Sequence, residues 1–353
     1  MSAGGTRMRK ALVVGASGIV GRNLCRHLHG RDGWQVVGAS RRAPGDGIAH
    51  APLDLLDAAS CRAALAAHRD VTHLFFMHRI TASDPVQEEE VHRRAVANVL
   101  DALEPAAALE RVCIVEGTKW YGSHLGPYRL PAKESHPRHM PPNIYYGQHD
   151  EVVARREGRA WTWCALRPHT IWGLTEGTGS SIAMTLAVYA VISRELGLPL
   201  RFPGPVATYD SISQATHMDI LQGALVWAAT DERCANQSFN ITNGDCYRWR
   251  QLWPRVAAFF AMPVADPQPL SLAVFMKDKA PLWDAVVRRE GLRPLSIDQL
   301  ADWRYGDGLL ACGWDDLSSV VKARTHGFTQ AMDSEDAFLA TLGGLVEAGL
   351  IPA

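Results

Sequence analysis

Ala11-Leu-Val-Val-Gly15-Ala-Ser17-Gly18-Ile19-Val-Gly21 is the stretch that decides the fold of this chain. An apolar run ends in glycine and is followed by a helical pattern at Asn23–Leu28, so the order predicts a strand, a tight turn and a helix. The spacing Gly15-x-x-Gly18-x-x-Gly21 suits a turn in which a pyrophosphate approaches bare backbone and the helix packs closely on the strand. N–H groups at the start of the helix would then hold the phosphates. We expect this segment, including Ser17 and Ile19, to bind a dinucleotide; the alternative is a purely structural glycine turn.

The pattern continues outward as an alternation of strands and helices. Short apolar runs predict further strands at 35–39, 48–53, 72–76, 111–115 and 162–166, and helical patterns cover 58–67 and 85–103. This alternation predicts an α/β fold with a doubly wound parallel sheet of the Rossmann type. We expect a cofactor-binding domain over residues 1–175, with a returning strand near 238–243. A smaller, mostly helical substrate-binding lobe over 176–353 would be interleaved with it.

Composition narrows the class of partner. The 36 basic and 37 acidic residues leave a formal net charge of −1, which offers no basic surface for nucleic acid or anionic membranes. Seven widely spaced cysteines contain no Cys-x-x-Cys, and the 14 histidines show no metal-ligand spacing, so neither disulfides nor a metal is expected. No secretory signal is present, and the apolar run 182–192 is too short to span a bilayer. We expect a cytoplasmic protein that acts on a small molecule, with a homodimer left open.

The end of the second strand predicts the cofactor. Ser40-Arg41-Arg42 stands where an NAD-selective site would place a carboxylate, and two guanidiniums with a hydroxyl suit the ribose phosphate of NADP(H). The alternative is a pair of solvated arginines. Asp54 and Leu55 end the third strand and could reach the adenine, although a helix-capping Asp is nearly as good an interpretation. Further cofactor contacts are expected near strand ends, at Met77, Gly117, Thr118, Pro168, Ile171 and Ser181.

The catalytic pattern of common short-chain dehydrogenases is missing. Those enzymes use Tyr-x-x-x-Lys, in which a phenol exchanges a proton with the substrate oxygen. None of the eight tyrosines has lysine four residues on, and Asp150 occupies that position after Tyr146. A lysine does follow the fifth strand, in Glu116-Gly-Thr-Lys119-Trp-Tyr-Gly. Because ligands bind at the carboxyl ends of the strands in this fold, Lys119 could reach the same oxygen.

These two segments resemble the progesterone 5β-reductase and iridoid synthase-like (PRISE) family of atypical extended short-chain dehydrogenases. The family signatures are Gly-x-Lys-His-Tyr…Gly-Pro-Phe and Asn-Phe-Tyr-Tyr-x-x-Glu-Asp. This chain matches them with Gly117-Thr-Lys119-Trp-Tyr121, Gly126-Pro-Tyr128 and Asn143-Ile-Tyr145-Tyr146-Gly-Gln-His-Asp150. It departs from them with Trp120 for His, Tyr128 for Phe and His149 for Glu. Other matches lie at Ser40–Arg42, Asn98–Asp101, Leu166–Pro168, Ile171–Gly173 and Thr242–Asp245.

The resemblance implies an NADPH-dependent reductase of activated carbon–carbon double bonds in enones or enals. It implies that a tyrosine hydroxyl and the Lys119 ammonium stabilise the enolate. Register with ordinary members favours Tyr146 over Tyr145 as the catalytic phenol. Expected substrate contacts are Trp120, Tyr121, Tyr128, Trp172 and Met184. Two alternatives remain: a ketone or aldehyde reductase that uses the same residues, and an NADP-sensing regulator without turnover.

Overall fold

The structure is a computed structural model of the 353-residue chain, and it describes residues 8–80, 84–104, 108–174 and 180–353. Seven parallel strands form the main sheet in the order β10-β6-β5-β4-β1-β2-β3. The order reverses between β1 and β4, which places the expected ligand crevice at their carboxyl ends. The strands are β1 (Arg9–Val14), β2 (Trp34–Ser40), β3 (Ala49–Pro52), β4 (His73–Phe76), β5 (Arg111–Val115), β6 (Thr162–Pro168) and β10 (Gln237–Ile241).

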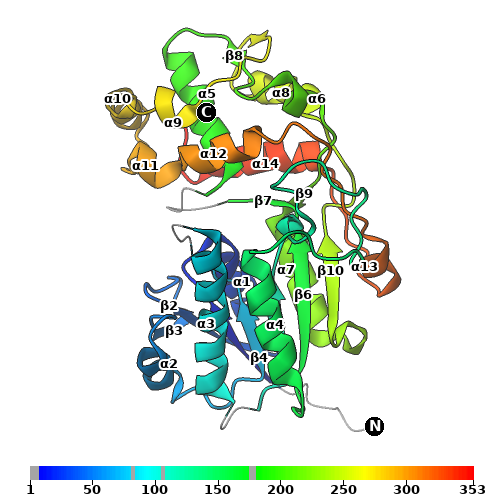
Figure 1. The fold of residues 1–353 in the computed structure, drawn as a ribbon. Helices are drawn as coiled ribbons and strands as arrows, with labels where there is room; N and C mark the ends of the chain where they lie inside the picture. The colour runs from blue at the N-terminus through cyan, green and yellow to red at the C-terminus, as the bar shows by residue number, and fades with distance from the viewer. Residues whose placement is uncertain (1–7, 81–83, 105–107, 175–179) are drawn as a thin grey trace, which may run out of the picture.

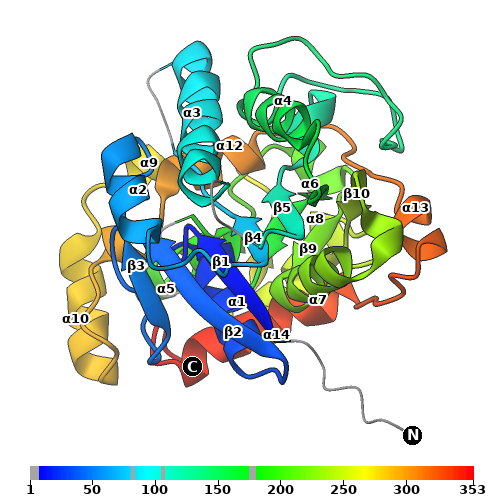
Figure 2. The same ribbon diagram turned by 90° about the horizontal axis from the view of Figure 1, so that it is seen from below.

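Helices cover both faces of this sheet, as Figures 1 and 2 show. One face packs against α1 (Ile19–His29) and α7 (Met218–Thr230). The other packs against α2 (Ala58–Leu65), α3 (Pro85–Leu103) and α4 (Ile144–Arg156). Alternate residues of β1 enter the two cores, Ala11 and Val13 on the α1 side and Leu12 and Val14 on the α3 side. A sheet buried on both faces confirms the doubly wound architecture.

A second lobe lies beyond the carboxyl ends of the strands (Figure 1). Its centre is α5 (Ile182–Glu195), which is buried on every side because nearly all its residues are apolar. Around it pack α8 (Trp249–Phe259), α9 (Leu272–Phe275), α10 (Ala280–Glu290), α11 (Ile297–Leu300), α12 (Trp303–Leu310) and α14 (Ser334–Glu347). The shorter elements are η1 (Thr118–Tyr121), β7 (Thr170–Trp172), β8 (Leu200–Arg201), α6 (Val206–Asp210), β9 (Ala215–His217), η2 (Glu232–Cys234), β11 (Val264–Ala265) and α13 (Val321–Thr325).

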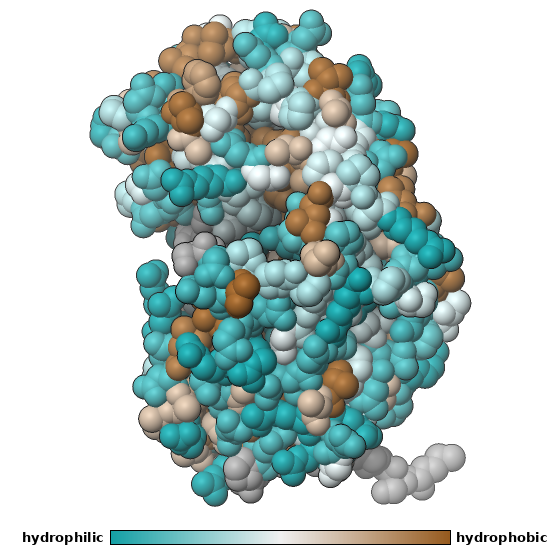
Figure 3. Space-filling view, viewed as in Figure 1, coloured by the Kyte–Doolittle hydropathy of each residue, from teal (hydrophilic) through white to brown (hydrophobic). Residues whose placement is uncertain are grey.

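The surface in Figure 3 is indented between the two lobes, and hydrophobic residues are more frequent on the upper lobe than around the sheet. No helix within the described residues is long and apolar enough to cross a membrane. The predicted strands and helices are confirmed, with β5 and α3 at the predicted bounds and the third strand shortened to Ala49–Pro52. The chain returns to the sheet through β10, as the sequence predicts.

Candidate active site

The glycine turn between β1 and α1 has the geometry of an anion site. Gly15 has φ 82°, and a Cβ there would lie 2.9 Å from the Met77 carbonyl oxygen. A Cβ on Gly21 would lie 2.3 Å from the Gly15 carbonyl oxygen, so only glycine lets α1 pack this closely on the turn. Gly18 begins α1 without a side-chain cap, and the first turn holds no acidic residue. N–H groups at that helix start are therefore suited to a pyrophosphate.

The segment that follows β2 presents positive charge. Arg41 and Arg42 are exposed, and within the described residues neither guanidinium forms an ion pair. The Ser40 hydroxyl is buried and donates to the Arg42 carbonyl oxygen, so this hydrogen bond stabilises the backbone turn that carries Arg41 and Arg42. Two unpaired guanidiniums beside the dinucleotide crevice fit a phosphate on the adenosine ribose.

Asp54 and Leu55 both have structural roles at the end of β3. The Asp54 carboxylate accepts the Leu56 N–H at 2.9 Å, and Asp57 rather than Asp54 caps α2. The Leu55 side chain is buried in the core on the α3 side, and its carbonyl accepts Asn98 Nδ2 at 2.8 Å. Leu55 can therefore face an adenine only with its backbone, and the contact of either residue with the cofactor stays a prediction.

The remaining predicted cofactor residues lie at or near the carboxyl ends of strands and before α5, and their contact with the cofactor stays a prediction. Met77 follows β4, and its N–H donates to the Val14 carbonyl at 3.0 Å. Thr118 Oγ1 accepts the Ser123 hydroxyl at 3.0 Å, and Pro168 ends β6. Ile171 lies half-buried in β7. Ser181 caps α5 by accepting the Met184 N–H at 3.3 Å and is fully buried, so its hydroxyl serves the helix.

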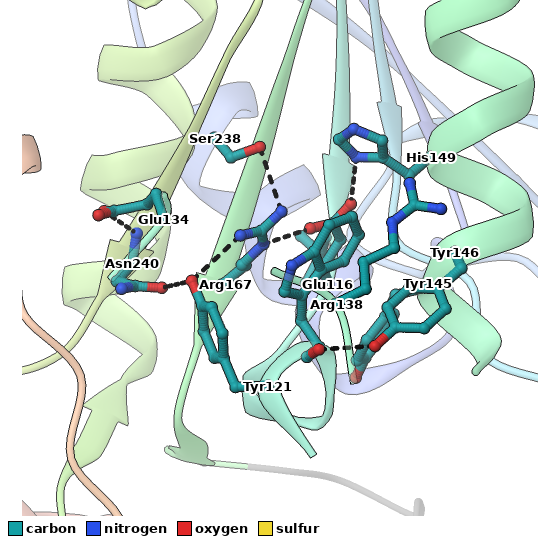
Figure 4. Close-up of polar contacts among 12 residues, drawn as sticks. Glu116, Tyr121, Glu134, Arg138, Tyr145, Tyr146, His149, Arg167, Ser238 and Asn240 are labelled. Carbon is teal, nitrogen blue, oxygen red and sulfur yellow. Dashed lines mark hydrogen bonds and ion pairs between the residues drawn. The ribbon is translucent and has the colours of Figure 1, made fainter. Parts of the chain in front are cut away.

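The structure distinguishes the two adjacent tyrosines. Tyr146 is buried, and its hydroxyl donates to the Trp120 carbonyl at 2.7 Å and accepts the His139 N–H at 2.8 Å (Figure 4). Tyr145 is half-buried, and its hydroxyl lies 2.8 Å from the position that a Cβ on Gly117 would take. Within the described residues the Tyr145 hydroxyl makes no hydrogen bond. The Tyr146 hydroxyl is thus engaged by backbone groups, whereas that of Tyr145 faces Gly117 at the end of β5, and which of the two phenols is catalytic stays a prediction.

Lys119 is the second residue of η1, which begins directly after Gly117. Its ammonium has no hydrogen-bond or ion-pair partner within the described residues. Burial lowers the pKa of Lys119, the Arg79 cation lowers it further, and Glu88 partly offsets both. Burial raises the pKa of Tyr145 to about 12, and the same Arg79 partly offsets this effect. The pKa values of both groups thus respond to the charges of Arg79 and Glu88.

Asn143 connects the two segments that carry these groups. Its side chain accepts the Tyr145 N–H at 3.0 Å, capping α4, and donates to the Lys119 carbonyl at 2.7 Å. This one amide fixes the start of α4 against η1. The phenol and the ammonium therefore rest on a shared support rather than on independent loops.

A buried ionic network lies next to the two tyrosines (Figure 4). Glu116 accepts from Arg167 Nε and is paired with His149 Nδ1, both at 2.7 Å. Arg167 also donates to the Tyr121 hydroxyl at 3.0 Å, and that hydroxyl donates to Asn240 Oδ1 at 2.7 Å. Burial raises the pKa of Glu116, but Arg167 and His149 outweigh it and hold the pKa below its usual value. The network therefore holds an ionised carboxylate directly before Gly117.

Two predicted substrate contacts, Trp120 and Tyr121, also contact this network. The Trp120 ring centroid lies 3.7 Å from the Arg167 guanidinium carbon and 5.0 Å from the Tyr146 ring, and Trp120 is buried. Tyr121 is buried and its hydroxyl is fully used. Neither side chain is among the lining residues of the cavity described next, and the contact of either with a substrate stays a prediction. The sequence analysis did not predict that Arg167 and Glu116 form a buried ion pair. A charged residue inside or next to a buried strand could have indicated one, because such residues are rarely buried unless they are paired.

An open cavity lies in the second lobe next to this crevice and holds a space of about 60 Å³. Of two residues predicted to contact the substrate, Trp172 lines this cavity, and Met184 is buried in the core around α5 and is not among the lining residues; both contacts stay predictions. Tyr128 reaches the cavity indirectly, because its hydroxyl donates to the lining residue Asp316. The lining also includes Ile182, Thr208, Gln214, Tyr247, Trp249, Leu309, Leu310 and Cys312.

Comparisons with known proteins agree with this arrangement. A family described as PRISE-like Rossmann-fold domain matches residues 49–303. An (S)-8-oxocitronellyl enol synthase from Nepeta racemosa is 32% identical over 97% of this chain and 91% of that enzyme. A 3-oxo-Delta(4,5)-steroid 5-beta-reductase from Arabidopsis thaliana is 29% identical over 97% of this chain and 93% of that enzyme.

A solved structure shows the same fold at low identity. The Bordetella bronchiseptica enzyme WbmG, in complex with NAD and UDP, has a TM-score of 0.68 and 15% identity, covering 98% of this chain and 97% of that chain. At this identity the likeness concerns the fold alone.

Proposed function

The chain belongs to the PRISE-like Rossmann-fold family of short-chain dehydrogenase enzymes, and we propose that it reduces the activated carbon–carbon double bond of an enone or enal with NADPH. In this proposal residues 1–175 hold the cofactor and residues 176–353 supply most of the substrate site. The relatives' names, an enol synthase and a steroid 5-beta-reductase, support reduction at a double bond conjugated to a carbonyl group.

The residues at the crevice fit NADP(H). The backbone of Gly15 and Gly18 and the start of α1 would hold the pyrophosphate, and Arg41 and Arg42 would pair with the ribose phosphate. No acidic side chain stands in the Ser40–Arg42 segment to accept from ribose hydroxyls, as an NAD-selective site requires. When bound, NADPH supplies the hydride that the β-carbon of the substrate accepts.

The chain's own contribution is charge stabilisation at the substrate oxygen. As the double bond is reduced, negative charge develops on the carbonyl oxygen and gives an enolate. The Tyr145 hydroxyl donates a hydrogen bond to that oxygen, and the Lys119 ammonium stabilises it electrostatically. Because the pKa of Tyr145 is raised to about 12, the phenol stays protonated and remains a donor throughout the neutral range. Water then protonates the α-carbon, so no second acid is required.

The observation that supports this proposal is that two groups near Gly117 have no hydrogen-bond partner within the described residues: the Tyr145 hydroxyl, which faces Gly117, and the Lys119 ammonium, two residues further along the chain. The test is incubation with NADPH or NADH and a simple 2-alkenal, followed by product identification. The proposal expects the saturated aldehyde, formed faster with NADPH. An allylic alcohol as sole product would show carbonyl reduction instead. Tight NADPH binding without oxidation by any enone or enal would support a regulator without turnover.

A further inference from the structure

The cavity of the second lobe contains polar groups that the proposed reaction does not use. Its apolar part is formed by Ile182, Leu309 and Leu310, as expected for a pocket that takes a hydrocarbon chain. Its polar part includes Trp172, Tyr247 and Asp316. A space of about 60 Å³ admits several non-hydrogen atoms.

Two donors at this cavity have no acceptor. Trp172 is fully buried, and its Nε1–H has no hydrogen-bond partner in the described part of the chain. The Tyr247 hydroxyl likewise makes no hydrogen bond there, although the residue is only 7% exposed. A buried N–H is costly to leave unpaired, and the Tyr247 hydroxyl is accessible at the cavity, so an acceptor from outside the chain would satisfy donors that the described chain leaves unpaired.

Asp316 adds an acceptor at the same place. One carboxylate oxygen accepts the Tyr128 hydroxyl, and the other lies 3.6 Å from His169 Nδ1. Burial raises the pKa of Asp316, but His169 and the Tyr128 hydrogen bond outweigh it and lower the pKa. Asp316 is therefore an ionised carboxylate, and its side chain is still 26% exposed.

The wall of the cavity is connected to the segment that carries Lys119. Cys312 lines the cavity, and its pKa is raised by burial and by Asp316 and lowered by Lys119, so its thiol senses both groups. Trp314 Nε1 donates to the Ser123 carbonyl at 3.2 Å, and the Ser123 hydroxyl binds Thr118 at 3.0 Å. These bonds tie the cavity wall to η1. A group held in the cavity is therefore fixed relative to η1.

We propose that this cavity binds a free hydroxyl group carried by the substrate at a distance from the reducible enal or enone, a subsite that rests on the proposed function. A hydroxyl can donate to Asp316 and accept from Trp172 or Tyr247 at once. An ammonium has no lone pair for the two donors, and a carbonyl or ether has no hydrogen for the carboxylate. The juxtaposition of two unpaired donors and an ionised carboxylate thus selects a hydroxyl.

The experiment compares four series of 2-alkenals, from hexenal to decenal, that end in a methyl, hydroxyl, methyl ether or ketone group. We expect the hydroxyl series to exceed the other three in kcat/KM by 10-fold or more at its best chain length. Asp316→Asn is expected to reduce this preference at least 10-fold, and Trp172→Phe, which keeps an aromatic ring but loses the N–H, at least 3-fold. Asp284→Asn, an exposed aspartate of α10, is the matched control and leaves the preference unchanged.

Equal kcat/KM for the methyl and hydroxyl series overturns the proposal, as does an equal or larger value for the ether or ketone. The proposal is also overturned if Asp284→Asn reduces the preference for the hydroxyl series as much as Asp316→Asn does. If no alkenal oxidises NADPH, the proposed function fails, and calorimetry with the saturated aldehydes then tests the subsite by itself. Tighter binding of the hydroxyl compound that Asp316→Asn removes supports the subsite, and equal binding of the methyl compound rejects it.

Discussion

Replacement of each adjacent tyrosine by phenylalanine separates catalysis from support. Tyr145→Phe removes the hydroxyl beside Gly117 without breaking any hydrogen bond of the described chain. Loss of one preorganised donor at a developing oxyanion costs about 10²–10³ in kcat, or about 2.7–4 kcal/mol. We therefore expect kcat to fall by that factor while Tm stays near the wild-type value.

Tyr146→Phe is the matched control, since it removes the same atom one residue away. It leaves the Trp120 carbonyl and the His139 N–H without their partner at 2.7 and 2.8 Å. Unpaired buried groups of this kind cost about 1–3 kcal/mol. With about 2.1 cal/mol/K of unfolding entropy per residue, a chain of 353 residues loses roughly 1.4 °C of Tm per kcal/mol. We expect a Tm lowered by about 1–4 °C and a kcat within about 3-fold of wild type.

The assay is NADPH oxidation at 340 nm under saturating enal, paired with thermal unfolding by circular dichroism. A 100-fold loss of kcat in Tyr146→Phe together with an active Tyr145→Phe would refute the assignment. It would mean that the free hydroxyl beside Gly117 is not the group that contacts the substrate oxygen.

Three further predictions concern charge. The Lys119 pKa lies below its usual 10.5, so we expect kcat to fall as the pH rises through that lowered pKa and the ammonium loses its proton. A plot of kcat against pH for Lys119→Met should lack this fall at high pH. A plot unchanged from the wild type contradicts the proposed role of Lys119. Replacing Arg41 and Arg42 by Ala raises the KM for NADPH by about 10- to 100-fold but leaves the KM for NADH within about 3-fold. An equal rise in both KM values would show that neither arginine binds the ribose phosphate of NADPH. Glu116→Leu strands the Arg167 cation and costs about 3–5 kcal/mol, or about 4–7 °C of Tm. The pKa of Glu116 is lower in the folded protein than in the unfolded chain, where it is about 4.5. The stability that its ionised carboxylate adds is therefore present above pH 4.5 and is lost as the pH falls through the folded pKa. If Tm depends on pH identically in Glu116→Leu and in the wild type, this role of Glu116 is contradicted.

The fold follows from local patterns because each strand of a doubly wound sheet is a short apolar run and each turn is marked by glycine or a capping residue. Residues 11–28 alone predicted the first strand, the glycine turn and the first helix, and α3 and β5 were predicted to the residue. The bounds of the third strand were less accurate, because its flanks are paired only on one side of the sheet edge.

The candidate site was predicted less completely, for two physical reasons. Motif register identified a pair of tyrosines but not which ring faces the crevice, since successive helical residues point about 100° apart and the direction depends on packing. Trp120 and Tyr121 follow a strand end and so were expected at the substrate. Only the fold shows that Arg167, 46 residues beyond Tyr121, donates to the Tyr121 hydroxyl and lies over the Trp120 ring.

By itself, the amino-acid sequence determined the parallel sheet, the dinucleotide turn, the positive Ser40–Arg42 segment and the displaced lysine, because each depends on residues adjacent in the chain. Tertiary structure alone decided which phenol is free, which charges are buried together and which distant side chains meet at Asp316. Those outcomes depend on contacts between segments far apart in the chain, and the hydrogen bonds that consume one hydroxyl and spare its neighbour form only when those segments are packed.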